Sequence, residues 1–430
     1  MSTSSTTRAR RGPEKIFRQL KNPHLRVFGA KDEIRTRDPD LGKVVLYQLS
    51  YFRLNLGHKN NHFFILNPNL PKKIEHYTVT ELLQTLQSFQ NQSYKEFSEG
   101  LFFSERKIPF LYSRPDDTIF FNLSISFILH SLHEMFNQEQ KILTNDIIQK
   151  TVRLLPLYRN KDHQASWNFW KTSPSQHFPF GFFAHRFRFF QIPDDIDDSA
   201  LALIISGASQ ELNLAFHQKI QRYANGVFKT MRYLPLPWRN WPVYNTFFIK
   251  DMPCGFDFVA LCNLMIWHKT NQLPLMDTDK ASLAFLNDVL MSDSLVDNPA
   301  LFSPYYPRLS LIVYHAARLE GLFPGFFLPA AKNRLLDLIQ LDFPQRQNSM
   351  DNLLFNIAAL RLRVKELPQN TPSVKDTRSF VFFVAGLFEE FSSPLLRSLR
   401  QLPFTHIQYH CQAMALTLWM EYLVLKEKSN

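Results

Sequence analysis

Four aspartates within five residues are the feature of this 430-residue sequence best suited to chemistry. They are Asp194, Asp195, Asp197 and Asp198, and they precede an apolar run that is predicted to be a buried helix. One or two acids at a helix start are explained by capping and by the helix dipole. Four clustered carboxylates also repel one another, and in a dry site they raise each other's pKa until one keeps its proton at neutral pH. The cluster therefore indicates either a general acid or an unusually acidic helix cap.

Other apolar runs begin in a similar way. Asp116 and Asp117 follow a proline and precede one such run, and capping is sufficient to explain them. Asp257 precedes another. If these helices begin side by side, Asp116, Asp117 and Asp257 lie at helix starts equivalent to the one that carries the aspartate cluster.

Two kinds of apolar segment alternate along the chain from about residue 60. Segments of the first kind have apolar positions three and four residues apart, as half-exposed helices do; they are 80–89, 144–155, 209–228, 281–291 and 331–341. Segments of the second kind are apolar nearly all round, as fully buried helices are; they are 118–132, 199–205, 258–267, 310–319, 353–360 and 407–425.

This alternation predicts an all-α fold, an (α/α)6-type toroid of about six helical hairpins over residues 59–430. The scarcity of glycine, 12 residues in all, also favours helices over a β-sandwich or barrel. In such a toroid the inner helices open into a central cavity. Aromatic residues expected near it are Trp167, Phe169, Trp170, Phe178, Phe182, Phe183, Trp238, Trp241, Tyr244, Tyr305 and Tyr306.

The run from Asp195 to Ala200 resembles the DxDD-T-A motif of class II terpene cyclases, the squalene–hopene cyclase and copalyl diphosphate synthase type. Ser199 stands where threonine is usual. The resemblance implies an α/α toroid whose motif opens an inner helix and an isoprenoid substrate. It implies that Asp197 protonates an alkene or epoxide to start cyclisation, while Asp195 and Asp198 hold it in its acidic form. Aromatic walls would then stabilise the carbocation.

Two other functions remain open. In a carbohydrate-active toroid, Asp117 or Asp257 would face Asp197 as the second carboxylate, and Trp167 and Trp170 would stack on a sugar. In a non-catalytic toroid, the same cavity would serve binding alone. The expected ligand is thus a small molecule, an isoprenoid or a glycan, with Asp194, Tyr305, Tyr306 and His315 among the residues that could contact it.

No metal or cofactor is expected from the sequence. Asp194, Asp195 and Asp198 also fit the DDxxD motif of class I prenyl enzymes, but the second metal motif of those enzymes is not found. His406 and His410 are spaced like one turn of a helix, without a third ligand in view. His315 is expected to be a core histidine, or else a hydrogen-bond donor to the acidic cluster.

Segment 1–58 is predicted to be a disordered extension. Residues 1–60 contain 13 Lys and Arg against 5 Asp and Glu, so most of the net charge of +11 lies there, and the nearly neutral remainder predicts no binding to nucleic acid. Residues 34–53 resemble peptides that arise when a reading frame runs through a bacterial tRNA gene. The first ~55 residues are therefore expected either not to be translated or to form a basic tail.

The expected location is the cytoplasm. Three cysteines, Cys254, Cys262 and Cys411, form no CxxC pair and suit a reducing compartment. The N-terminal region lacks the apolar stretch of a secretory signal. Apolar runs such as 380–388 have about half of the roughly 20 residues that a membrane span needs.

Overall fold

The computed structural model describes residues 74–93, 97–109, 112–160, 165–179, 191–227, 230–231, 238–248, 255–341, 348–364, 371–386 and 406–429. The basic segment 1–58 lies outside the described residues. Phe182 and Phe183, which were expected near the cavity, and Cys254 also lie outside the described residues.

The described part of the chain is mostly helical, with thirteen α-helices. Six are buried along nearly their whole length: α3 (Phe120–Ser131), α5 (Ile196–Ile205), α7 (Phe258–Thr270), α10 (Leu309–Leu322), α12 (Ser349–Arg361) and α15 (Gln412–Ser429). The others are α2 (Val79–Asn91), α4 (Gln138–Tyr158), α6 (Gln210–Gln221), α8 (Asp277–Met291), α9 (Ser294–Asp297), α11 (Pro329–Gln340) and α13 (Val374–Ser379). Short 3-10 helices span Ile74–His76, His133–Met135, Trp238–Asn240 and Pro299–Leu301.

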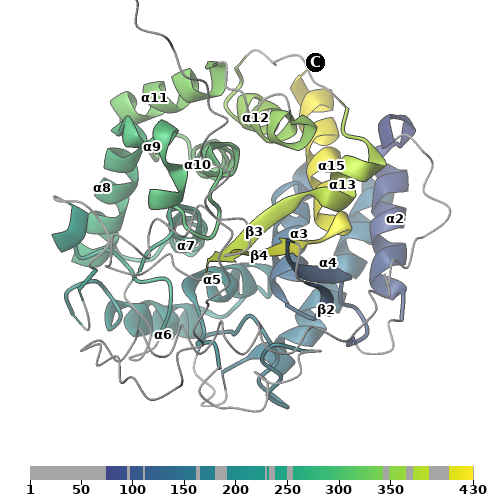
Figure 1. Ribbon diagram of the computed structural model, residues 1–430, viewed down its shortest axis with the longest axis horizontal. Coiled ribbons are helices and arrows are strands. Elements are labelled where there is room, and N and C mark those ends of the chain that lie inside the picture. Colours follow the sequence, from purple (N-terminus) through teal and green to yellow (C-terminus); the bar gives the residue numbers. More distant parts are fainter. Residues whose placement is uncertain are drawn as a thin grey trace, which may run out of the picture. The chain divides into compact units, whose positions relative to one another are not determined.

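The six buried helices pack against one another in chain order. Helix α3 contacts α5, α5 contacts α7, α7 contacts α10, α10 contacts α12, and α12 contacts α15. Helix α15 then contacts α3, so the sequence of neighbours closes (Figure 1). Because each of these helices has a neighbour on both sides, little of its surface faces solvent, which explains the nearly continuous apolar sequence.

Several of these helices begin at the same end of the assembly. Asp257, the N-cap of α7, accepts hydrogen bonds from Ser303 Oγ at 2.7 Å and from the backbone N–H of Tyr305 at 2.9 Å, and both residues precede α10. Arg308, the N-cap of α10, pairs with Asp351 in the first turn of α12 at 2.9 Å. The start of α7 is thus tied to that of α10, and the start of α10 to that of α12.

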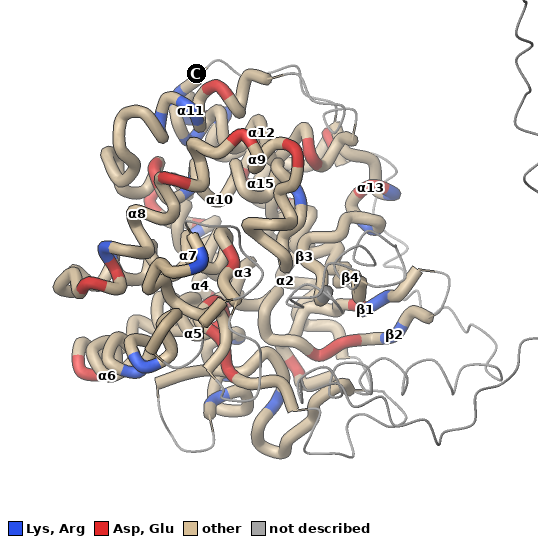
Figure 2. Tube along the Cα trace, turned by 60° about the vertical axis from the view of Figure 1, so that its left-hand side comes forward, with Lys and Arg blue, Asp and Glu red and all other residues tan. Residues whose placement is uncertain are grey.

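Helices with one polar face cover this inner set. Helix α2 packs on α4 and α15, α8 packs on α7 and α11, and α11 packs on α10 and α12. Acidic and basic residues both occur on α6 and α8 (Figure 2), as expected for helices with one solvated side. In the part of the chain that the structure describes, no helix is both long and apolar enough to cross a membrane.

A four-stranded antiparallel sheet departs from the predicted all-α fold. Its strands lie in the order β2 (Tyr112–Asp116), β1 (Ser104–Ile108), β4 (His406–His410) and β3 (Val381–Gly386). Glu105 pairs with His410, so a strand that follows α2 meets a strand that precedes α15. Pro115 lies in β2, an edge strand, where its missing N–H breaks no ladder.

The sheet lies over the end at which the inner helices begin. The N–H of Val384 in β3 donates to the carbonyl of Tyr305, just before α10, at 2.9 Å. Phe383 packs edge-on against Phe120, the first residue of α3, with ring centroids 4.7 Å apart. The strands therefore bring aromatic side chains to the helix starts.

Predictions for two segments of the sequence are corrected by these elements. The buried helix expected over 407–425 begins only at Gln412, because 406–410 form β4; His406 and His410 are therefore not one helical turn apart. The helix expected over 209–228 ends at Gln221, where the chain turns.

Candidate functional site

The aspartate cluster forms the start of the buried helix α5. Asp195 is its N-cap, and its Oδ1 accepts the backbone N–H of Asp198 at 2.8 Å. Asp197 and Asp198 lie in the first helical turn, and all four aspartates are at most 7% exposed. Capping accounts for Asp195 but not for the burial of three more carboxyl groups.

Asp194 is held by polar side chains outside the helix. Its Oδ2 accepts hydrogen bonds from Asn160 Nδ2 and Ser166 Oγ, both at 2.5 Å, and its Oδ1 accepts Asn168 Nδ2 at 3.2 Å. Lys219 Nζ donates to the same Ser166 hydroxyl at 2.6 Å. These contacts give Asp194 a structural role, because they join the segment before α5 to Asn160, Ser166 and Asn168.

Asp197 is a hydrogen-bond acceptor on both oxygens. Tyr306 Oη donates to Oδ2 at 2.5 Å, and Asn263 Nδ2 donates to Oδ1 at 2.7 Å. Arg318 Nη2 in turn donates to Asn263 Oδ1 at 2.5 Å. Burial raises the pKa of Asp197, while Tyr306, Asn263 and the charge of Arg318 act in the opposite direction. Helices α7 and α10 therefore supply groups that stabilise Asp197 as a carboxylate.

Asp195 and Asp198 form a coupled pair of buried acids. The pKa of Asp198 is raised well above its usual range by burial and, next, by the charge of Asp195. The pKa of Asp195 is also raised well above its usual range, by burial and then by the charge of Asp197. No N–H or O–H donor of another described residue reaches either oxygen of the Asp198 carboxyl group, which interacts with the Asp195 side chain. A buried carboxylate without a donor is unfavourable, so these surroundings favour the protonated form of the pair.

A cavity of about 100 Å³ adjoins three of the four aspartates. Its lining consists of these acids and a largely aromatic wall: Phe120, Phe169, Ile192, Asp195, Asp197, Asp198, Thr246, Phe247, Ala260, Tyr305, Tyr306, Phe383, Val384, Ala385 and Tyr409. Its residues come from α3, α5, α7, β3, β4 and the loops before α5, α7 and α10.

The aromatic residues of the wall pack on one another. Phe383 and Tyr409 stack with ring centroids 4.4 Å apart and an angle of 13° between the rings. Phe120 meets Phe383 edge-on, and Phe247 meets Tyr305 in the same way at 5.6 Å. Offset and edge-on contacts of this kind fix the rings in place. The cavity therefore combines fixed π faces with carboxyl groups on one wall.

Only some of the predicted site residues line the cavity. Asp195, Asp197, Asp198, Phe169, Tyr305 and Tyr306 do, whereas Asp116, Asp117, Asp257, Trp167, Trp170 and His315 are not among the lining residues.

Asp116 and Asp117 pair with cations and do not cap α3. Arg106 lies 2.6 Å from Asp116, and Trp170 Nε1 donates to the same carboxylate at 2.9 Å. Lys171 lies 2.9 Å from Asp117. The N-cap of α3 is Ile119, which makes no side-chain capping bond. The pair therefore does not cap α3 itself; Asp116 Oδ1 instead accepts the backbone N–H of Thr118 at 3.1 Å, two residues before the helix begins.

Asp257, Trp167 and His315 also have structural contacts. Asp257 caps α7, and burial raises its pKa to about 7. The backbone N–H of Trp167 donates to Ser199 Oγ at 3.0 Å. The Nδ1 of His315 lies 2.8 Å from the carbonyl of Leu311, one turn earlier in α10, which is the satisfied core position expected for it. Burial holds the pKa of His315 well below its usual range.

Several residues around the acids were missed in the sequence. Arg318 is fully buried in α10 and contacts the rings of Phe127 and Tyr314 at 4.8 and 5.2 Å. An arginine inside an otherwise apolar helix was a usable signal, because such a charge needs a buried partner. Phe120, Phe247, Phe383 and Tyr409 carried no such signal in a chain with 41 phenylalanines.

Comparison of the chain with protein-family models gave no match, and neither did comparison with curated proteins or with solved structures. The geometry of the cavity and the motif at Asp195–Ala200 are therefore the features that bear on function.

Proposed function

We propose that this protein is an isoprenoid cyclase of the class II type, which protonates an alkene in the aromatic cavity and guides the resulting carbocation to a ring. The observation that carries the proposal is the composition of the cavity wall. Asp195, Asp197 and Asp198 lie on one part of the wall, and aromatic rings make up much of the rest. An acid and an aromatic lining are the two requirements of cation-forming chemistry on a hydrocarbon.

The proton donor in this proposal is Asp198, which shares its proton with Asp195. Its carboxyl group receives no hydrogen bond from an N–H or O–H donor of the described residues, so the neutral acid is its stable form. Proton transfer to the alkene breaks the O–H bond and forms a C–H bond. The negative charge that remains is spread over the Asp195–Asp198 pair. The cyclised cation then loses a proton from a neighbouring carbon to the ionised Asp195–Asp198 pair, which forms the C=C bond of the product and restores the acid.

Asp197 has a different part in this scheme. Tyr306 and Asn263 donate to both of its oxygens, which favours an ionised carboxylate beside the cavity. Such a carboxylate attracts a developing cation, in addition to the attraction by the aromatic faces. The motif resemblance assigns the proton to Asp197 instead, and the two assignments are separated by the variants described below.

The volume of the cavity limits the substrate. About 100 Å³ is less than the ~150 Å³ of a protein cavity that accepts benzene. This volume suits one five-carbon isoprene unit, the end of the chain that is protonated. A short isoprenoid whose terminal alkene enters first fits this space better than a fully enclosed C30 chain.

We also propose that the described helices form a toroid. The closed order of contacts among α3, α5, α7, α10, α12 and α15 supports an (α/α)6 toroid, with α2, α4, α6, α8 and α11 among its outer helices. The shared end at which α7, α10 and α12 begin supports it as well. In this arrangement the cavity lies where the inner helices start, and the sheet covers it.

The proposal is tested by turnover of geranyl, farnesyl and geranylgeranyl diphosphate, the corresponding alcohols and squalene, with products analysed by gas chromatography and mass spectrometry. We expect a cyclised product from at least one isoprenoid. Asp198→Asn, which keeps the shape but not the acid, should lower the rate by about 10²–10⁴-fold. Asp194→Asn is the matched control, because this aspartate belongs to the same segment but does not line the cavity.

The outcome that contradicts the proposal is the binding of isoprenoids without turnover by the wild-type chain. That result favours a non-catalytic binding protein. Loss of activity in Asp197→Asn with full activity in Asp198→Asn would keep the cyclase but move the donor to Asp197. The Asp194→Asn chain should retain its rate per folded molecule, as judged by circular dichroism.

A further inference from the structure

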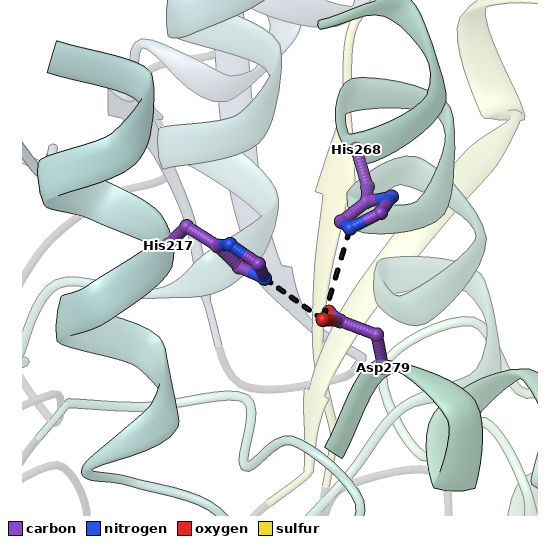
Figure 3. Close-up of side chains that lie close together, drawn as sticks. All are labelled: His217, His268 and Asp279. Carbon is purple, nitrogen blue, oxygen red and sulfur yellow. Dashed lines mark hydrogen bonds and ion pairs between the residues drawn. The ribbon is translucent and has the colours of Figure 1, made fainter. Parts of the chain in front are cut away.

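A second group of ionisable side chains lies outside the aspartate cavity. His217 on α6, His268 on α7 and Asp279 on α8 are all buried, and one ligand atom from each lies within 4.8 Å of the other two. Figure 3 shows both imidazole rings turned toward the carboxylate of Asp279. None of these residues lines the aspartate cavity. The proposed cyclase activity therefore does not use them.

The distances within this cluster are close to those of a tetrahedral zinc site. Nε2 of His217 lies 2.9 Å from Asp279 Oδ2, and Nε2 of His268 lies 3.7 Å from the same oxygen. With metal–ligand bonds of about 2.0–2.2 Å, ligand atoms around tetrahedral Zn²⁺ are about 3.3–3.6 Å apart. The two contacts with Asp279 Oδ2 would change by a few tenths of an ångström to admit the ion, and the ligand atoms of the two histidines lie within 4.8 Å of each other.

A backbone carbonyl next to His268 is a candidate fourth ligand. The carbonyl of Pro274, in the turn between α7 and α8, lies 3.4 Å from Nε2 of His268. The turn also carries Leu275 and Met276, which are 45% and 44% exposed. A thin exposed segment therefore separates the cluster from solvent, and an ion could enter there.

The carboxylate of Asp279 is held in the way that metal ligands usually are. Tyr244 Oη donates to its Oδ1 at 2.6 Å, and the backbone N–H of Met276 donates to its Oδ2 at 2.7 Å. Hydrogen bonds of this kind orient ligating carboxylates and are part of most metal sites. Two imidazoles and one carboxylate are a ligand set that zinc commonly takes.

We propose that His217, His268 and Asp279 bind a zinc ion, with the carbonyl of Pro274 or a water molecule as the fourth ligand. The three side chains come from α6, α7 and α8, so the ion joins two helices with polar outer faces to one of the buried helices. Its role is structural, since all three side chains are buried and the site is separate from the aspartate cavity. The sequence did not indicate the site because His217 and Asp279 are 62 residues apart.

The test uses the full-length chain, freed of metal with a chelator and titrated with Zn²⁺ against a chromogenic chelator. We expect one ion per chain with sub-micromolar affinity and a higher melting temperature after binding. His268→Gln and Asp279→Asn should each weaken binding by about 100-fold or more. His315→Gln is the matched control, a histidine that is 2% exposed like His217 and His268 but lies outside the cluster.

Cobalt substitution keeps the test decisive if a variant fails to fold. Co²⁺ bound to nitrogen and oxygen ligands in a tetrahedral site gives visible d–d absorption without a thiolate charge-transfer band. That spectrum from the wild-type chain supports the proposal. The proposal is overturned if the folded chain binds no metal, if thiolate bands point to Cys262 or Cys411, or if His268→Gln and Asp279→Asn bind like the wild type.

Discussion

Tyr306 and Asp197 are joined by a 2.5 Å hydrogen bond between side chains that are 109 residues apart in the sequence. Tyr306 lies in the loop before α10, whereas Asp197 lies in the first turn of α5. Both are buried and both line the cavity. This contact places the aspartate cluster at the start of α5 next to the loop that leads into α10.

Removal of that hydrogen bond should affect both stability and turnover. Tyr306→Phe leaves one oxygen of a buried carboxylate without its donor, which should lower the free energy of unfolding by about 1.5–3 kcal/mol. The pKa of Asp197 should rise further, because Tyr306 favours the ionised form. Cyclisation should slow, since the cation loses a partner. Urea denaturation and product formation measure the two effects.

The matched control for this variant is Tyr314→Phe. Tyr314 Oη donates to Glu421 Oε2 at 2.8 Å in an equally buried place, but Tyr314 does not line the cavity. Tyr314→Phe should lower the free energy of unfolding by a similar amount and leave the rate of turnover per folded molecule unchanged. Equal loss of activity in both variants would indicate that Tyr306 acts through stability alone.

The carboxyl group of Asp257 should make stability depend on pH. Burial raises its pKa to about 7 in the folded chain, from about 3.9 in an unfolded one. The folded state therefore binds this proton more tightly, and its contribution to stability is fully present below about pH 4 and is lost as the pH rises through 7.

The effect of Asp257 is measured as the difference in unfolding free energy between the wild-type chain and Asp257→Asn. Other groups, such as His410 with its pKa lowered to about 4, change stability in the opposite direction over part of this range. Asp257→Asn keeps the helix cap but cannot titrate. The stability of the wild type relative to this variant should decline from pH 4 to pH 7 in chemical denaturation. A constant difference over that range contradicts the prediction.

Filling the cavity should remove ligand binding without unfolding the protein. Ala260 on α7 lines the cavity, and Ala260→Leu would place three more carbons there. We expect a change in unfolding free energy within about 1 kcal/mol and loss of turnover. Ala358→Leu on α12 is the control, because Ala358 is also buried but does not line the cavity, and overpacking there should cost about 1–3 kcal/mol. Strong destabilisation by Ala260→Leu would mean that the space is not free.

Much of the helical framework could be predicted from the sequence because burial on all sides leaves a simple pattern. The runs that became α3, α5, α7, α10 and α12 are apolar nearly all round, and Asp195 begins α5 as expected. The aspartate cluster could be located for the same reason.

The sheet and most of the cavity wall could not be predicted. Strand β1 contains Glu105, Arg106 and Lys107, and it pairs with β4 from the far end of the chain, so its sequence shows little of its partner. Phe383 and Tyr409 reach the cavity only because that pairing forms. The partners of Asp197 are Asn263 on α7 and Tyr306 in the loop before α10, 66 and 109 residues away, and over such distances spacing in the sequence carries no information.

The most direct test of the central claim is the reaction in D₂O. If Asp198 protonates an alkene, each cyclised product should carry one deuterium from solvent at the site of protonation, and a diphosphate substrate should keep its diphosphate. Asp198→Asn should form this product about 10²–10⁴-fold more slowly. A product without deuterium, formed with release of diphosphate, would contradict acid-initiated cyclisation in this protein.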